Sequence, residues 1–317
     1  MQKIKTAAVI GLGAIGIPLA DSLHKKLGGN FTLLCDESHF QKLSSRSVYI
    51  NGKKFSAKVV VSNSQLKISP DIIFVCVKNY SLDSASEVIN KTCSEKTIIL
   101  PLQNGVFSHS YFVKKFPKNI ILQGFAQGPN TKHIENDYIY QNPGVYHLGT
   151  KNSEWKDSAA CVAKLLLTSG INCILEDDIE YSVWKKFMLN VAGNALTALT
   201  QIDYSQFRYS QEAKNLCVST MQEFKQVAAA LNIKITKSDM NKTLEYFLHY
   251  TEPKHTSMLD DVLNKRPTEN EYIAGYISRL SQEHELSTPV IDTLYRLMKI
   301  REDVYMNKMI NKGENRK

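Results

Sequence analysis

Three glycines with the spacing Gly11-x-Gly13-x-x-Gly16 lie directly after a short apolar run, Ala7 to Ile10. Gly11 would allow a tight turn, Gly13 a close approach of the backbone to a ligand, and Gly16 close packing of a helix on a strand. The N–H groups at the start of such a helix favour an anion such as a pyrophosphate. The pattern therefore predicts a dinucleotide-binding turn, with a ligand-free glycine turn and a secretory signal as the alternatives.

A second group of polar residues lies far along the chain. Lys186, Asn190 and Asn194 are spaced four apart within an otherwise apolar stretch. On a helix they form one stripe, with each residue about 6 Å above the last. A lysine and two amides are costly to bury unless they face polar groups. Spacing alone leaves two interpretations equal: a polar site, or a surface lysine with asparagines that satisfy neighbouring backbone.

The elements that must position these residues differ between the two halves of the chain. Before residue 177, short apolar runs alternate with helical patterns, and the run 71–78 has the continuous apolarity of a parallel strand buried on both faces. We expect a hairpin turning at Asn51-Gly52 within residues 47–61, and another within residues 137–150. After Asp178, apolar residues recur at helical spacing.

This alternation predicts an α/β fold with two domains. The first, residues 1–177, is an N-terminal Rossmann-type dinucleotide-binding domain, and the second, residues 178–317, is an all-helical substrate and catalytic domain. We expect the active site outside the carboxyl ends of the parallel strands.

The composition limits the class of protein. The chain has 317 residues, 43% of them hydrophobic, and a net charge of +8 from scattered lysines, so we expect no nucleic-acid partner and no membrane span. The six cysteines form no CxxC pair and the histidines show no HxxxH spacing, so we expect no metal and a cytoplasmic location. Composition leaves a monomer and a homodimer open.

The lysine segment resembles the ketopantoate reductase (2-dehydropantoate 2-reductase) family. That family carries a tryptophan, then a lysine two residues later, then asparagines four and eight residues beyond, as Trp184, Lys186, Asn190 and Asn194 do here before Leu196-Thr197-Ala198-Leu199. Further matching motifs cover nearly the whole chain: Val77-Lys78, Gln103-Asn104-Gly105, Thr256 to Asp261, and Thr268-Glu269 followed by Tyr272-Ile273 and Gly275.

The resemblance implies a reaction and a set of roles. The reaction is NAD(P)H-dependent reduction of a small 2-oxo acid, with ketopantoate converted to (R)-pantoate for pantothenate and coenzyme A biosynthesis. Lys186 would be the general acid, and Glu269 would hydrogen-bond near Lys186 and either the substrate or the nicotinamide ribose. Asn104, Asn190, Asn194 and Ser257 would bind the substrate. The implied cofactor contacts are Gly11, Leu12, Gly13, Ala14, Ile15, Gly16, Asp36, Lys78, Asn104 and Glu269.

Several of these roles have a purely structural alternative. Glu269 could be a surface acid, Ser257 could be the N-cap of a helix, and Asn104 could belong to a simple Asn-Gly turn.

The sequence departs from the family at three places. Asp36 stands where many members carry an arginine, and a carboxylate there repels a 2′-phosphate and favours NADH, while Lys78 keeps NADPH open. Tyr204 and Lys254 replace substrate-side asparagines. The alternatives are therefore an NAD-dependent D-2-hydroxyacid dehydrogenase of the same family and a non-enzymatic dinucleotide-sensing protein.

Overall fold

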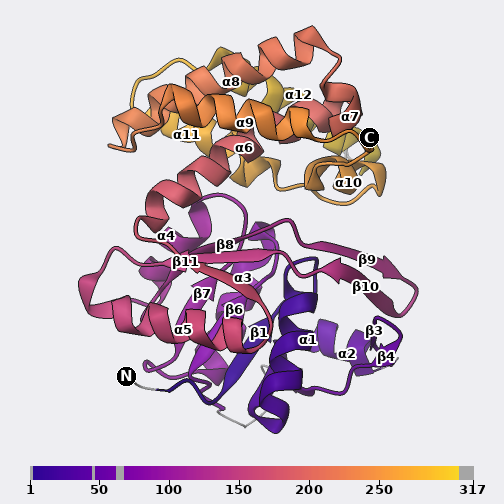
Figure 1. Cartoon of the computed structure of the whole chain (residues 1–317), viewed down its shortest axis with the longest axis vertical. Helices are drawn as coiled ribbons and strands as arrows, with labels where there is room; N and C mark the ends of the chain where they lie inside the picture. Colours follow the sequence, from indigo (N-terminus) through magenta and orange to yellow (C-terminus); the bar gives the residue numbers. More distant parts are fainter. Residues whose placement is uncertain (1–2, 45–46, 62–67, 307–317) are drawn as a thin grey trace, which may run out of the picture. The chain divides into compact units, whose positions relative to one another are not determined.

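The structure is a computed structural model that describes residues 3–44, 47–61 and 68–306 (Figure 1). The chain divides into two compact units, Met1–Val183 and Trp184–Lys317. The division falls inside helix α6 (Ile179–Thr200), which begins close to the predicted domain boundary after residue 177.

A parallel sheet forms the centre of the first unit. Its strand order is β5-β2-β1-β6-β7, and every pairing within it is parallel. The strands are β1 (Ala7–Ile10), β2 (Phe31–Cys35), β5 (Lys58–Val61), β6 (Ile72–Val75) and β7 (Ile98–Pro101). Strands β1 and β6 are buried along their whole length, as the continuous apolar runs predict.

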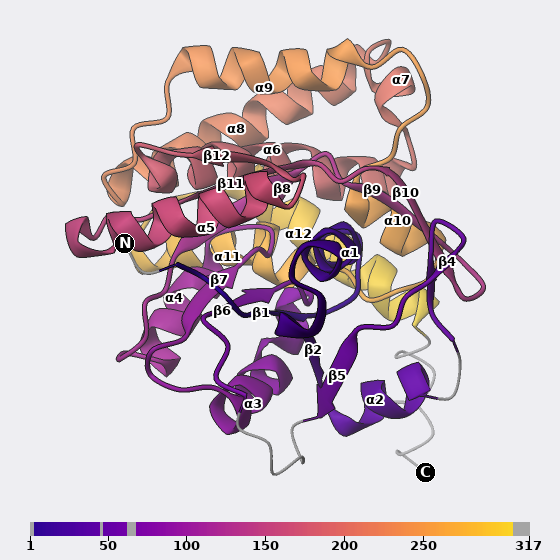
Figure 2. The same ribbon diagram turned by 60° about the horizontal axis from the view of Figure 1, so that its bottom comes forward.

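Helices cover both faces of this sheet. Alternate residues of β1 point to opposite sides, so Ala7 and Val9 join one core while Ala8 and Ile10 join another. The first core includes α1 (Gly16–Leu27) and α5 (Lys156–Thr168), and the second includes α3 (Leu82–Thr92) and α4 (Phe107–Lys115). Figure 2 shows α1 and α3 on opposite sides of β1 and β6. This arrangement confirms the predicted Rossmann-type α/β fold.

The Asn51-Gly52 turn is confirmed, but its hairpin is shorter than predicted. Asn51 and Gly52 both have positive φ, 50° and 74°, and join β3 (Tyr49–Ile50) to the antiparallel β4 (Lys53–Lys54). The residues that follow belong instead to β5, which pairs with β2 in the parallel sheet. An edge position beside a long buried strand offered these apolar residues more burial than a two-stranded ribbon does.

The predicted hairpin within residues 137–150 is wrong. Strand β10 (Asp137–Asn142) pairs with β3 and with β9 (Asn130–Ile134), whereas β11 (Val145–Gly149) pairs with β8 (Gln123–Gln127) and β12 (Asn172–Leu175). Gly144, with φ 85°, turns the chain from one sheet to the other. A Cβ there would lie 2.8 Å from the Gln127 carbonyl oxygen, so only glycine fits this crossing.

The second unit is helical, as predicted. After α6 it contains α7 (Tyr204–Phe207), α8 (Gln211–Ala230), α9 (Lys237–His249), α10 (Ser257–Leu263), the short 3₁₀ helix η4 (Asn270–Tyr272), α11 (Ala274–Glu283) and α12 (Pro289–Tyr305). The rings of Trp184, Phe187 and Phe224 pack α6 against α8. Across the described residues, each helix is too short or too polar to cross a membrane.

Candidate active site

The glycine turn between β1 and α1 has the geometry that dinucleotide binding requires. A Cβ on Gly16 would lie 1.9 Å from the Gly11 carbonyl oxygen, and one on Gly11 would lie 2.7 Å from the Val77 nitrogen. The fold itself therefore requires both glycines. A Cβ on Gly13 would meet no heavy atom within 4 Å, so the fold does not explain this glycine. The open space over Gly13 fits the close approach of a pyrophosphate.

The amino end of α1 is suited to an anion. No side chain caps this helix, and its first turn carries no acidic residue. The two carbonyls of the turn are held from distant strands: Thr131 donates to the Ala14 oxygen at 3.0 Å, and the buried Tyr146 hydroxyl donates to the Ile15 oxygen at 2.8 Å. The sequence offered no local signal for either contact, because the partners lie more than a hundred residues apart.

The carboxyl ends of β6 and β7 are joined beside this turn. The Asn79 amide donates to the Asn104 carbonyl oxygen at 3.0 Å, and the Gln103 amide donates to the carbonyl oxygens of Val75 and Val77 at 3.0 and 3.1 Å. These contacts bring the loops of Lys78 and Asn104 to the same edge of the sheet as Gly11. The sequence analysis assigned no positioning role to Asn79 or Gln103. The available signal was an amide side chain directly next to a predicted contact residue, Lys78 or Asn104.

Asp36 follows the last residue of β2 at this same edge and directly precedes helix α2 (Glu37–Ser44). Its carboxylate accepts hydrogen bonds from the His39 backbone and ring and from the hydroxyls of Ser38 and Ser84. Burial alone would raise the pKa of Asp36, but these hydrogen bonds together hold it well below its usual range. The carboxylate therefore stays charged at neutral pH, at the carboxyl end of the second strand.

In the helical unit, Lys186, Asn190 and Asn194 form the predicted stripe on α6. Asn190 is 5% exposed and Asn194 is 4% exposed, whereas Lys186 is half-buried. Burial, and after it the positive charge of Lys254, lowers the pKa of Lys186 to about 8. This lysine can therefore hold a proton at neutral pH and release it readily.

Asn194 has an unsatisfied donor. Within the described part of the chain, its buried amide nitrogen has no hydrogen-bond partner. A buried donor left without an acceptor costs about 1–3 kcal/mol, so such atoms in native proteins often mark a ligand or a water. This atom agrees with the substrate contact that the resemblance implies.

The amino end of α10 is fixed to α6 next to this stripe. The hydroxyls of Thr197 and Thr256 lie 2.8 Å apart, and Thr197 also donates to the Asn194 carbonyl oxygen. Thr256 is the N-cap of α10, since its side chain accepts a hydrogen bond from Leu259 N. The alternative that Ser257 is the cap is therefore wrong. Ser257 is the first residue of the helix and is exposed.

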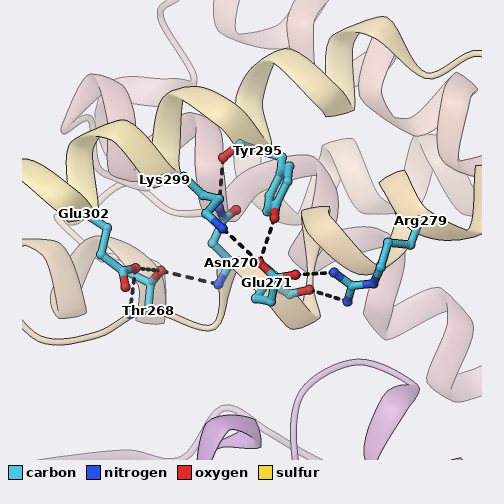
Figure 3. A network of polar contacts seen from close by, with 7 residues as sticks. All are labelled: Thr268, Asn270, Glu271, Arg279, Tyr295, Lys299 and Glu302. Carbon is cyan, nitrogen blue, oxygen red and sulfur yellow. Dashed lines mark hydrogen bonds and ion pairs between the residues drawn. The ribbon is translucent and has the colours of Figure 1, made fainter. Parts of the chain in front are cut away.

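Glu269 is 4% exposed, so the alternative of a surface acid is wrong. Its two neighbours in the chain are anchored to α12 (Figure 3). Thr268 donates to the Glu302 carboxylate from its hydroxyl at 2.5 Å and its nitrogen at 3.1 Å, and the Asn270 amide donates to the Tyr295 carbonyl at 3.0 Å. Glu302 thus fixes the residue directly before Glu269, a contact that the sequence did not signal.

A second ionic group continues from this segment. Glu271 pairs with Arg279 and Lys299 and accepts a hydrogen bond from the Tyr295 hydroxyl at 2.7 Å (Figure 3). Burial would raise the pKa of Glu271, but these partners lower it. Residues of α11 and α12 therefore also hold Glu271, two residues after Glu269.

Comparison with family models decides the relationship. The model described as "Ketopantoate reductase PanE/ApbA" matches residues 7–153, and "Ketopantoate reductase PanE/ApbA C terminal" matches residues 178–302. The chain belongs to the ketopantoate reductase family. As a member of it, this protein is an NAD(P)-dependent oxidoreductase of the class that acts on a CH–OH group, which disfavours the non-enzymatic sensor.

Curated relatives cover nearly the whole chain. The 2-dehydropantoate 2-reductase of Lactococcus lactis is 26% identical over 93% of this chain and 97% of its own length. The 2-dehydropantoate 2-reductase of Archaeoglobus fulgidus is 24% identical over 94% of this chain and 98% of its own length.

Solved structures share the fold. A ternary complex of D-mandelate dehydrogenase with NADH and anilino(oxo)acetate superimposes with a TM-score of 0.84, at 24% identity over 95% of this chain and 99% of that one. A dimeric ketopantoate reductase from Staphylococcus aureus gives a TM-score of 0.79, at 21% identity over 95% and 99% of the two chains.

Proposed function

We propose that this protein reduces 2-oxo acids with a nicotinamide cofactor, and that ketopantoate is among its substrates. The product would be (R)-pantoate, for pantothenate and coenzyme A biosynthesis. The observation that carries the proposal is Lys186: a half-buried lysine on α6, with its pKa lowered to about 8, in line with two buried asparagines. The names of the curated relatives support the same reaction.

The site residues have separate roles in the proposed reduction. A bound reduced nicotinamide supplies the hydride to the ketone carbon. Lys186 donates a proton to the ketone oxygen as negative charge develops there. Asn190, Asn194 and Ser257 hold the polar groups of the substrate. Glu269, fixed through its neighbours to α12, orients the ammonium of Lys186.

The glycine turn and the loops after β6 and β7 hold the cofactor in this proposal. The pyrophosphate lies over Gly13, where no protein atom occupies the Cβ position. Lys78 and Asn104 contact the cofactor from the neighbouring strand ends. Asp36 favours NADH, since its carboxylate stays charged and would repel a 2′-phosphate. The six cysteines are free thiols, which suits the reducing cytoplasm that we propose as its location.

The test is a rate measurement on the purified protein. We expect ketopantoate to accelerate the loss of reduced-nicotinamide absorbance, with NADH preferred over NADPH. Cofactor binding, followed by quenching of protein fluorescence, is the control. Binding of both cofactors without turnover of any 2-oxo acid would overturn the proposal.

A second candidate is an NAD-dependent D-2-hydroxyacid dehydrogenase. Asp36 favours it, and the fold is shared with a D-mandelate dehydrogenase whose structure contains NADH. The relative kcat/KM values on ketopantoate, 2-oxoisovalerate and phenylglyoxylate separate the two. A clear preference for phenylglyoxylate with NADH would select the dehydrogenase, and a preference for ketopantoate would select the reductase.

A further inference from the structure

Two of the sequence departures, Tyr204 and Lys254, are in direct contact in the folded helical unit. The Tyr204 nitrogen donates to the Lys254 carbonyl oxygen at 2.9 Å. The ring of Tyr204 stacks on that of Tyr250, with centroids 5.1 Å apart, and Tyr246 packs edge-on against both. Tyr204 is buried, and its ring and backbone nitrogen therefore hold the ring of Tyr250 and the backbone of Lys254 in place.

The ammonium of Lys254 is oriented but not neutralised. Its nitrogen donates to the Tyr250 hydroxyl at 2.8 Å and lies 4.1 Å from the centroid of that ring. The lysine is exposed, and within the described part of the chain no carboxylate pairs with it. Two of the nearby acids have other partners: Asp203 caps α7, and Asp260 pairs with His255. Lys254 therefore presents a fixed positive charge with donor capacity left over.

This charge lies close to the α6 stripe. Phe247, one turn before Tyr250, packs on Gly193, where a Cβ would lie 2.3 Å from its ring. Thr256, two residues after Lys254, is hydrogen-bonded to Thr197 of α6. The positive charge of Lys254 lowers the pKa of Lys186, in addition to the larger effect of burial. Contacts on both sides of Lys254 thus hold its segment beside the Asn194 end of the stripe.

The result is a surplus of donors and of positive charge on one part of the helical unit. Lys186 and Lys254 contribute two ammonium groups, and Asn194 contributes a buried amide nitrogen without a partner in the described residues. An anion bound beside these two cations would relieve their mutual repulsion. Acceptors that can satisfy all three donors are the oxygens of a 2-oxo acid anion.

We propose that Lys254, oriented by Tyr250, recognises a carboxylate of the substrate. The inference rests on the proposed reduction of 2-oxo acids and adds the residue that selects the anion. Lys186 donates to the ketone oxygen while Lys254 pairs with a carboxylate, which is either the one next to the ketone or a second one at the far end of a dicarboxylic substrate.

The experiment compares kcat/KM of the wild type and of Lys254→Asn on three kinds of substrate. The first is a monocarboxylic 2-oxo acid, the second its neutral amide, and the third a 2-oxo diacid of similar size. Lys254→Arg keeps the charge, and Lys225→Asn on α8 removes an exposed lysine outside the site. Thermal melting and cofactor affinity, measured on every variant, show that folding and nucleotide binding are unchanged.

We expect Lys254→Asn to lose about tenfold to a hundredfold in kcat/KM, mostly through KM, on the substrate whose carboxylate it recognises. A loss on the acid but not on its amide assigns the carboxylate beside the ketone. A loss on the diacid but not on the monoacid assigns the distal one. Lys254→Arg should recover most of the activity, and Lys225→Asn should match the wild type.

An equal loss on all three substrates, or no loss on any, would overturn the inference while leaving the reductase intact. A wild-type preference for neutral aromatic ketones would overturn it as well. Failure of the wild type to turn over any 2-oxo acid would instead refute the proposed function, so the two failures are distinguishable.

Discussion

The two candidate regions, the nucleotide half in the first unit and the helical half in the second, are built in different ways. In the first unit, the glycines that the motif predicts lie in one contiguous strand–turn–helix segment: the Gly11 carbonyl five positions earlier requires Gly16, while Val77 just beyond a neighbouring strand requires Gly11. In the second unit, α6, the segment before α10 and the segment at η4 each contribute residues far apart in sequence. Those residues are held by long-range contacts such as Thr197 with Thr256 and Thr268 with Glu302.

The difference shows which kind of site a motif can report. Steric limits fix the residue types of a tight turn: a Cβ at Gly11 or at Gly16 would collide with backbone atoms. A dispersed site depends on side chains that carry no fixed spacing relative to one another. Substitutions that change cofactor binding without changing catalysis, or catalysis without changing cofactor binding, therefore test this difference.

The largest effect is expected at Lys186. Replacing it with glutamine removes the proposed acid, so kcat should fall by about 10²–10⁴-fold while cofactor affinity is retained. Steady-state kinetics and cofactor titration check this, with Lys225→Gln as the control. A variant with near-normal kcat would exclude Lys186 as the general acid.

Two glycine substitutions separate folding from binding in the nucleotide half. In Gly16→Ala the new Cβ would overlap the Gly11 carbonyl oxygen, so the melting temperature should fall, at a cost of about 1–3 kcal/mol. In Gly13→Ala the Cβ meets no protein atom, so stability should hold while cofactor affinity falls about tenfold. Unchanged cofactor affinity in Gly13→Ala would show that the pyrophosphate does not lie over this turn.

The pH profile tests the electrostatics of the helical half. A general acid works in its protonated form, and the pKa of Lys186 is lowered to about 8 by burial and by Lys254. The kcat/KM for reduction should therefore be level below that pH and fall about tenfold per unit above it. In Lys254→Asn the falling limb should move to higher pH, because a neighbouring positive charge is gone. A limb that does not move would place Lys254 too far from the acid.

Asp36 tests the nucleotide half by charge alone. Asp36→Asn keeps an oxygen that can cap α2 but removes the negative charge, so folding should be little affected. The ratio of kcat/KM with NADPH to that with NADH should rise about fivefold, as expected for relief of a partly screened repulsion. An unchanged ratio would show that this carboxylate serves only as a helix cap.

The smallest effect is expected at Glu302, which reaches the site through Thr268. Glu302→Ala should lower kcat about threefold, the value of one ordinary hydrogen bond, with cofactor affinity unchanged. Glu302→Gln retains an acceptor oxygen and should recover most of the loss. If both variants lose stability without any change in kcat, the contact anchors the helices and does not position Glu269.

The sequence alone determined buried strands of the parallel sheet such as β1 and β6, the helical second half and the glycine turn. Each of these follows from a periodicity or a steric limit within one short segment, as at Ala7 to Ile10 and at Gly11 to Gly16. It also placed Lys186, Asn190 and Asn194 on one stripe, because a helix sets that geometry without any tertiary contact.

Only the tertiary structure decided how strands pair across sheets and which buried groups are satisfied. The turn at Gly144 resembles that of a hairpin, but the strands on either side of it pair with strands in two different sheets. The burial of Glu269, the capping of α10 by Thr256 and the contact of Tyr204 with Lys254 all join distant segments. Such contacts form because packing and hydrogen bonding depend on proximity in space, which local sequence patterns do not record.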